Sequence, residues 1–154
     1  MIYADSSFTF SLYALDDNTA VANQVYQADG RRPLLFTQWQ ELELANTLRL
    51  GLQRAKRQQL PVRYQMANCL KRISEDLREG RLRRMQLDWP ACTRQAERLS
   101  AAHTETLGIV MLDLWHVACA IELGADTFWT FDEEQETVAK ACGRFRKVVG
   151  LGLS

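Results

Sequence analysis

The sequence predicts an α/β protein with a central, mostly parallel sheet, on two observations. Short apolar runs alternate with longer segments of helical periodicity, which is typical of parallel strands joined by crossover helices. The chain has 154 residues, of which 47% are hydrophobic, enough for one compact domain with a real core. We therefore expect a single domain over residues 1–154.

Five short segments have the composition of strands. The segment DTFWTF is typical, because β-branched and aromatic side chains are enriched in strands. The expected strands are residues 1–4, 33–37, 84–89, 126–131 and 145–150.

Six longer segments are expected to be helices. In one of them, apolar residues recur at helical spacing from Leu112 to Leu123, and Gly124 follows where a helix end favours a residue tolerant of positive φ. This helix is predicted to be buried. The full set is a helix capped at 16–19 and reaching about 29, then 38–56, 61–79, 90–104, 112–123 and 133–142.

Composition excludes several classes of protein. The four cysteines are scattered singly, which does not match a zinc site and is typical of buried free thiols in a reducing compartment. The first residues include an acid at position 5 and no basic stretch, and no 18-residue apolar run occurs. We expect a cytoplasmic protein without a secretory signal or a membrane span.

Acidic residues follow several of the predicted strands. Asp5 ends the first strand, Glu41 and Glu43 open the helix after the second, Asp113 opens the buried helix and Asp132 ends the aromatic strand. In an open α/β sheet, ligands bind outside the carboxyl ends of the strands. These acids are therefore the candidate functional residues.

Each acid also has an ordinary structural explanation. Asp5 before two serines could be a helix N-cap, and Asp132 followed by Gln135 fits a variant of the capping box. Asp113 in a first helical turn would favour the helix dipole. Convergence of four carboxylates on one edge is harder to explain in this way, because like charges repel unless a cation compensates them.

A cluster of carboxylates suits Mg²⁺ or Mn²⁺, which prefer hard oxygen ligands. Such an ion lowers the pKa of a bound water and offsets the charge that develops on a leaving oxygen. Hydrolysis of a phosphodiester is the natural reaction for such a site.

At this point four motifs together resemble the PIN-domain ribonucleases, and among them the VapC-type toxins of bacterial toxin–antitoxin pairs. The motifs are IYADSS, ELELANTLRL, LDLWHVACAIELGAD and FWTFDEEQETVAKACG, in the family's order and over the whole chain. The resemblance implies a PIN-like α/β/α sandwich and an endoribonuclease dependent on Mg²⁺ or Mn²⁺. It also implies an RNA substrate, a cognate antitoxin and a homodimer.

The resemblance assigns the catalytic and metal-binding roles to Asp5, Glu43, Asp113 and Asp132. The acid before LANTL in the family pattern is Glu43, whereas a helical projection places Glu41 on the apolar face. We follow the motif, since helix starts are uncertain by two or more residues. Ser7 and Asn46 are candidates for holding waters or carboxylates in the cluster.

The zero net charge conceals a basic middle. Residues 49–84 contain eleven basic and three acidic side chains, whereas residues 1–48 and 85–154 are both acidic. Two interpretations stay open, a solvated helical hairpin or a surface that guides RNA phosphates and presents a groove to an antitoxin.

The histidine, the tryptophans and the overall function also have other interpretations. His116 and the four tryptophans are expected to be core residues rather than catalytic groups or base-stacking platforms. An aspartyl-phosphate phosphatase would need a second acid two residues after the first, where this chain has Ser7. The alternative from another class is a non-catalytic RNA-binding or receiver-like module whose acids only cap helices.

Overall fold

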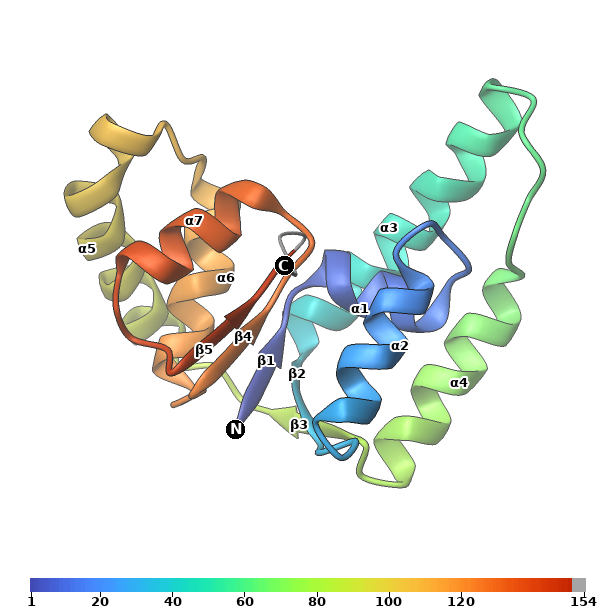
Figure 1. Ribbon diagram of the computed structural model, residues 1–154, viewed down its shortest axis with the longest axis horizontal. Helices are drawn as coiled ribbons and strands as arrows, with labels where there is room; N and C mark the ends of the chain where they lie inside the picture. Colours follow the sequence, from blue (N-terminus) through green and yellow to red (C-terminus); the bar gives the residue numbers. More distant parts are fainter. Residues whose placement is uncertain (151–154) are drawn as a thin grey trace.

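The computed structural model describes residues 1–150, in which a five-stranded sheet lies between two groups of helices (Figure 1). All neighbouring strands are parallel, in the order β3-β2-β1-β4-β5. The strands are β1 (Ile2–Ala4), β2 (Leu34–Thr37), β3 (Leu82–Met85), β4 (Thr127–Trp129) and β5 (Lys147–Val149). The helices are α1 (Ser6–Tyr13), α2 (Thr19–Ala28), α3 (Gln38–Arg57), α4 (Met66–Arg78), α5 (Trp89–Leu107), α6 (Met111–Glu122) and α7 (Glu133–Ala141). The predicted parallel α/β architecture is confirmed.

The sheet contributes side chains to two separate cores. Ile2 and Ala4 pack with residues of α1, α3 and α4 on one face, whereas Tyr3 packs with α5, α6 and α7 on the other. Successive side chains of a strand point to opposite faces, so even a three-residue strand serves both cores. Figure 1 shows the two helix groups on either side of the sheet.

The structure corrects three expectations. Helix α1 was not among the predicted elements; it begins after Asp5, whose side chain accepts a hydrogen bond from the backbone N–H of Phe8. The third strand ends at Met85 and lies earlier than residues 84–89. Helix α4 begins at Met66 rather than at Pro61.

None of the helices within the described residues is both long and apolar enough to cross a membrane. The three cysteines Cys69, Cys92 and Cys119 are buried, Cys142 is half-buried, and all four are free thiols. The prediction of free, largely buried thiols is confirmed.

The contribution of α3 to the stability of the core can be tested with two of its leucines. Leu48 is fully buried, whereas Leu42 on the same helix is 64% exposed. We expect Leu48→Ala to lower the free energy of unfolding by about 2–5 kcal/mol, because it removes buried methyl groups and leaves a cavity. Leu42→Ala should change it by about 0.5 kcal/mol or less. Denaturant unfolding of the two variants would measure the difference, and equal losses would contradict the packing of α3.

Candidate active site

Asp5 is the most buried of the predicted acids. It follows β1, caps α1 and has no exposed surface. The Ser7 hydroxyl lies 2.8 Å from both carboxylate oxygens, the backbone N–H of Phe8 donates over 2.9 Å, and the Thr130 hydroxyl donates over 2.9 Å. Burial raises the pKa of Asp5, while His116 and these hydrogen bonds oppose the rise. The prediction that Ser7 holds the carboxylate of a candidate acid is confirmed for Asp5.

Thr130 connects Asp5 to Asp132. Its hydroxyl donates to Asp5 and accepts the backbone N–H of Asp132 over 2.9 Å. Asp132 in turn caps α7, because its side chain accepts the backbone N–H of Gln135 over 2.9 Å. Two of the acids are therefore helix caps, as the structural interpretation predicted, and they share a connecting hydroxyl.

Asp113 lies in the first turn of α6 and is half-buried. The side-chain amide of Gln135 donates to its carboxylate over 3.3 Å. Burial and the negative charge of Asp132 raise the pKa of Asp113 to about 6, with Glu134 adding to the rise and Gln135 opposing it. Gln135 thus contacts both Asp113 and Asp132, and the two carboxylates lie near enough for the charge of one to affect the other.

Glu43 projects from α3 towards α6. Its Oε2 lies 2.8 Å from Nε2 of His116, and Nδ1 of His116 lies 3.0 Å from the Tyr3 hydroxyl. Although Glu43 Oε2 and His116 Nε2 lie close together, neither of these two atoms makes a hydrogen bond of good angular geometry. Burial acts to raise the pKa of Glu43, but the contact with His116 outweighs it and the pKa is lowered.

His116 is a core histidine by burial, as predicted, yet it also faces the acids. Only 1% of the residue is exposed. Burial acts to lower the pKa of His116, but Glu43, then Asp5 and Asp113, raise it. The imidazole therefore contacts Glu43 and is affected by the charges of Asp5 and Asp113, which the sequence alone did not indicate.

Glu41 points elsewhere. Its carboxylate pairs with Arg84 at 2.8 Å and ties the start of α3 to the edge strand β3. Of the two acids left open by the helical projection, Glu43 is the one that contacts His116. Asn46 is exposed.

The prediction that the tryptophans are core residues is confirmed only in part. Trp129 is fully buried in β4. Trp89 is 51% exposed and stacks on Trp115 with ring centroids 5.4 Å apart, so the prediction that it anchors the core is wrong. Trp89 begins α5, where Asp88 caps the helix and leaves the indole at the surface.

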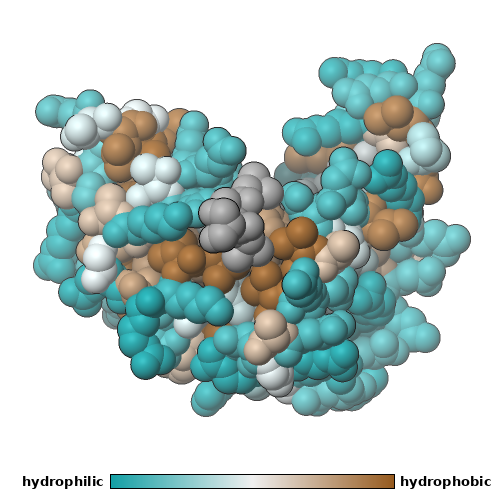
Figure 2. Space-filling model, viewed as in Figure 1, coloured by the Kyte–Doolittle hydropathy of each residue, from teal (hydrophilic) through white to brown (hydrophobic). Residues whose placement is uncertain are grey.

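Asp5 and Asp132 lie where the carboxyl ends of β1 and β4 meet the first turns of α1 and α7, Glu43 lies further along α3, and Asp113 lies in the first turn of α6. On that side the surface is hollowed between the projecting end of α3 and the group α5–α7 (Figure 2). Within residues 1–150, no three acidic, histidine or cysteine side chains form a ready-made set of metal ligands. The donor chemistry nevertheless fits a hard cation, since Glu43 Oε2 is buried without a well-formed hydrogen bond and Asp113 is repelled by Asp132.

Comparison with known families decides the relationship. The family described as the PIN domain matches residues 2–141. The chain belongs to the PIN-domain family. The resemblance inferred from the four motifs is therefore confirmed, and no curated protein sequence matches the chain.

Solved structures share the fold at low sequence identity. VapC20 of Mycobacterium tuberculosis, a toxin that cleaves the sarcin-ricin loop, is 16% identical, with 89% of this chain and 94% of that chain covered at a TM-score of 0.59. VapBC2 of Rickettsia felis, bound to a DNA fragment from its promoter, is 15% identical over 97% and 98% of the two chains at 0.60. FitAcB of Neisseria gonorrhoeae is 16% identical over 97% and 96% at 0.54. The fold of this PIN domain is thus the one found in VapC toxins.

Thr130 provides a test of the connected acids. We expect Thr130→Val to lower the free energy of unfolding by about 1–3 kcal/mol, because the Asp132 N–H loses its acceptor and buried Asp5 loses a donor. Thr127→Val is the matched control in β4, since the Thr127 hydroxyl donates only to the adjacent Asp126. Chemical denaturation of both variants would measure this, and an equal, small loss in each would show that Thr130 does not couple the acids.

Proposed function

We propose that this PIN domain is an endoribonuclease dependent on Mg²⁺ or Mn²⁺ and the toxin of a toxin–antitoxin pair. The observation that carries the proposal is the neighbouring pair of Asp113 and Asp132, both contacted by Gln135, in which burial and then the charge of Asp132 raise the pKa of Asp113 to about 6. A divalent cation would relieve the repulsion between the two carboxylates. Asp5 and Glu43 reach the same end of the sheet through Thr130 and His116.

In the proposed mechanism Asp5, Glu43, Asp113 and Asp132 hold the cation. When bound, the ion would supply an activated water and offset negative charge on the scissile phosphate. Asp5 cannot swing away, because its carboxylate accepts from Ser7, Phe8 and Thr130. His116 holds Glu43 towards α6, and the half-exposed Asp113 is open to water and substrate.

The basic middle supports an RNA substrate. In the described structure several of its side chains are already engaged, for example Arg84 with Glu41 and Arg81 with Asp76 and Glu79. Six exposed basic residues of this segment make neither a side-chain hydrogen bond nor an ion pair with the described residues, namely Arg49, Arg54, Lys56, Arg57, Arg78 and Arg83. Such cations contribute phosphate contacts that are independent of sequence.

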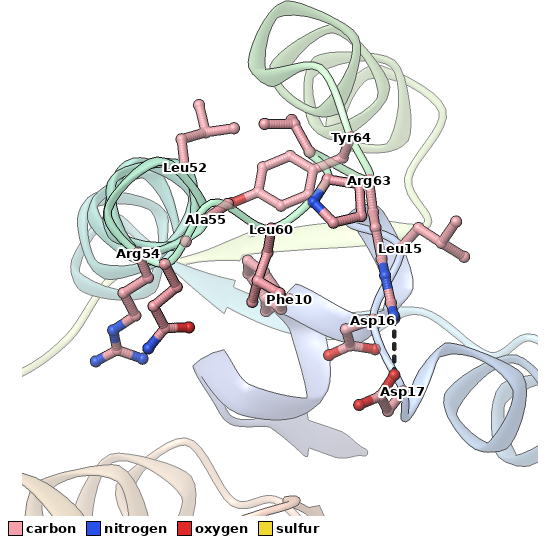
Figure 3. Close-up of a pocket in the computed structure, with 14 residues that line it drawn as sticks. Phe10, Leu15, Asp16, Asp17, Leu52, Arg54, Ala55, Leu60, Arg63 and Tyr64 are labelled. Atoms are coloured by element: carbon pink, nitrogen blue, oxygen red, sulfur yellow. Dashed lines mark hydrogen bonds and ion pairs between the residues drawn. The ribbon is translucent and has the colours of Figure 1, made fainter.

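The antitoxin is proposed to bind the groove beside this basic middle. The groove has a volume of about 350 Å³ and lies between the end of α3, α1 and the segment that connects α3 to α4. Figure 3 shows Phe10, Leu60 and Tyr64 at its apolar floor and Arg54 at its rim, with Arg63 paired to Asp17. An apolar segment with acidic flanks fits this lining. We also propose that the toxin is a homodimer, as the family resemblance implies.

The alternative of a non-catalytic module is supported by the same caps. Asp5 and Asp132 do accept the hydrogen bonds of N-cap residues. A capping role predicts no response to metal, however, so metal binding separates the two candidates.

Substitution of Asp113 tests the proposed function. We expect Asp113→Asn to melt at or above the wild-type Tm in EDTA, because it removes the repulsion from Asp132 while its oxygen can still accept from Gln135. The variant should gain little Tm on addition of Mn²⁺ and should cut no RNA. Thermal melts with and without Mn²⁺, together with cleavage of a labelled RNA, would measure these effects.

The wild-type protein provides the complementary control. Its RNA cleavage should stop in excess EDTA and return on addition of Mg²⁺ or Mn²⁺. Cleavage by pure protein at full rate in EDTA would refute the metal mechanism. An Asp113→Asn variant that melts lower in EDTA but keeps its metal response and activity would make Asp113 a structural residue.

The interaction with RNA is tested on the last turn of α3. We expect replacement of Arg54, Lys56 and Arg57 by Gln to weaken RNA binding and to reduce the slope of log Kd against log salt by up to about 2–3, roughly 0.7–0.9 for each phosphate that is no longer neutralised. Arg84→Gln is the matched control, because Arg84 is already paired with Glu41. A binding titration across salt concentrations with an unchanged slope for the triple variant would assign these residues to solvation or antitoxin binding.

A further inference from the structure

Two glutamines occupy the same position in their helices, the third residue after the N-cap. Gln40 in α3 completes a full capping box with Thr37. Its Oε1 accepts the backbone N–H of Thr37 over 2.9 Å and its Nε2 donates to the carbonyl of Ala4 over 2.8 Å. Every polar group of the Gln40 amide is thus used for structure.

Gln135 in α7 has a different set of contacts. The N-cap N–H that it would accept belongs to Asp132 and is already taken by the Thr130 hydroxyl. Its Nε2 instead donates to Asp113 over 3.3 Å, and its backbone N–H donates to Asp132 over 2.9 Å. One glutamine therefore contacts both members of the repelling acid pair.

The amide oxygen of Gln135 is left without a donor. The residue is 5% exposed, and Oε1 is buried with no hydrogen-bond partner in the described structure. While Asp113 is ionised, the amide nitrogen faces its carboxylate, because the reversed amide would place two oxygens against each other. A buried acceptor without a donor destabilises the protein, which a capping role alone does not explain.

We propose that Gln135 is a positioning residue of the acid cluster, which holds Asp113 beside Asp132 and offers its amide oxygen as a neutral ligand to the divalent cation or to a water bound to it. The inference rests on the proposed metal-dependent function. Glutamine carbonyl oxygens are among the hard ligands that such ions accept. A neutral amide also brings an oxygen to the site without adding to the repulsion between the acids.

Two substitutions separate this role from capping. Gln135→Leu removes both the hydrogen bond to Asp113 and the free oxygen; we expect its Kd for Mn²⁺ to rise by about tenfold or more, as for other residues that orient metal ligands. Gln135→Glu adds a negative charge beside Asp113 and Asp132. It should melt below wild type in EDTA, bind Mn²⁺ at least as tightly and gain more Tm on binding it. Calorimetric Mn²⁺ titration and thermal melts measure both variants.

The matched control adds the same charge to the exposed side of the helix. Thr137 lies there on α7, and Thr137→Glu is expected to keep the wild-type Kd for Mn²⁺ and the wild-type metal response. If Gln135 acts only as a cap, Gln135→Glu should still melt below wild type in EDTA, because its charge lies beside Asp113, but it should gain neither affinity for Mn²⁺ nor Tm response to it. That result overturns the inference even if Gln135→Leu fails to fold.

The outcomes also separate this inference from the proposed function. Wild-type Mn²⁺ affinity in Gln135→Leu, together with much weaker affinity in Asp113→Asn, would overturn the role of Gln135 and leave the metal site in place. A wild-type protein that binds no Mn²⁺ would overturn both. Weaker Mn²⁺ binding in Gln135→Leu with near wild-type Tm in EDTA would support the inference.

Discussion

Burial of the Asp5 carboxylate is the constraint on which the rest of the site depends. A charge without exposed surface is stable only if hydrogen bonds replace its water, and here Ser7, Phe8 and Thr130 supply them. The bond from Thr130 crosses a sequence separation of 125 residues. It therefore fixes the end of β4 against the end of β1, and with it the start of α7.

Glu43 and Asp113 are also each contacted by a neighbouring polar side chain. Glu43 is held by His116, and Asp113 by Gln135. The partners come from α6 and α7, which pack on the face of the sheet opposite α3 and α4. Glu43 on one face of the sheet is thus joined to α6 on the other face, and the carboxyl ends of β1 and β4 hold Asp5 and Asp132 between the two cores.

The functional and structural interpretations of the acids turn out to be compatible. Asp5 and Asp132 cap helices, as local sequence predicts, and the same two residues point into the candidate site because a parallel strand followed by a helix ends at that edge. Capping uses one carboxylate oxygen in Asp132, so the role of a cap does not consume the whole side chain. Local patterns could therefore predict both roles without distinguishing them.

The sequence by itself determined the parallel α/β class, most of the helices and strands and the caps Asp5 and Asp132, because periodicity, caps and turn residues act within a few positions along the chain. It did not predict α1, which contains three aromatic residues typical of strands but begins at the Asp5 cap and buries Phe8. Only the tertiary structure decided that Glu43 rather than Glu41 meets His116, and that Gln135 reaches Asp113 instead of its own cap. These contacts join elements far apart in the chain, so they depend on how α3, α6 and α7 pack, which no local pattern contains.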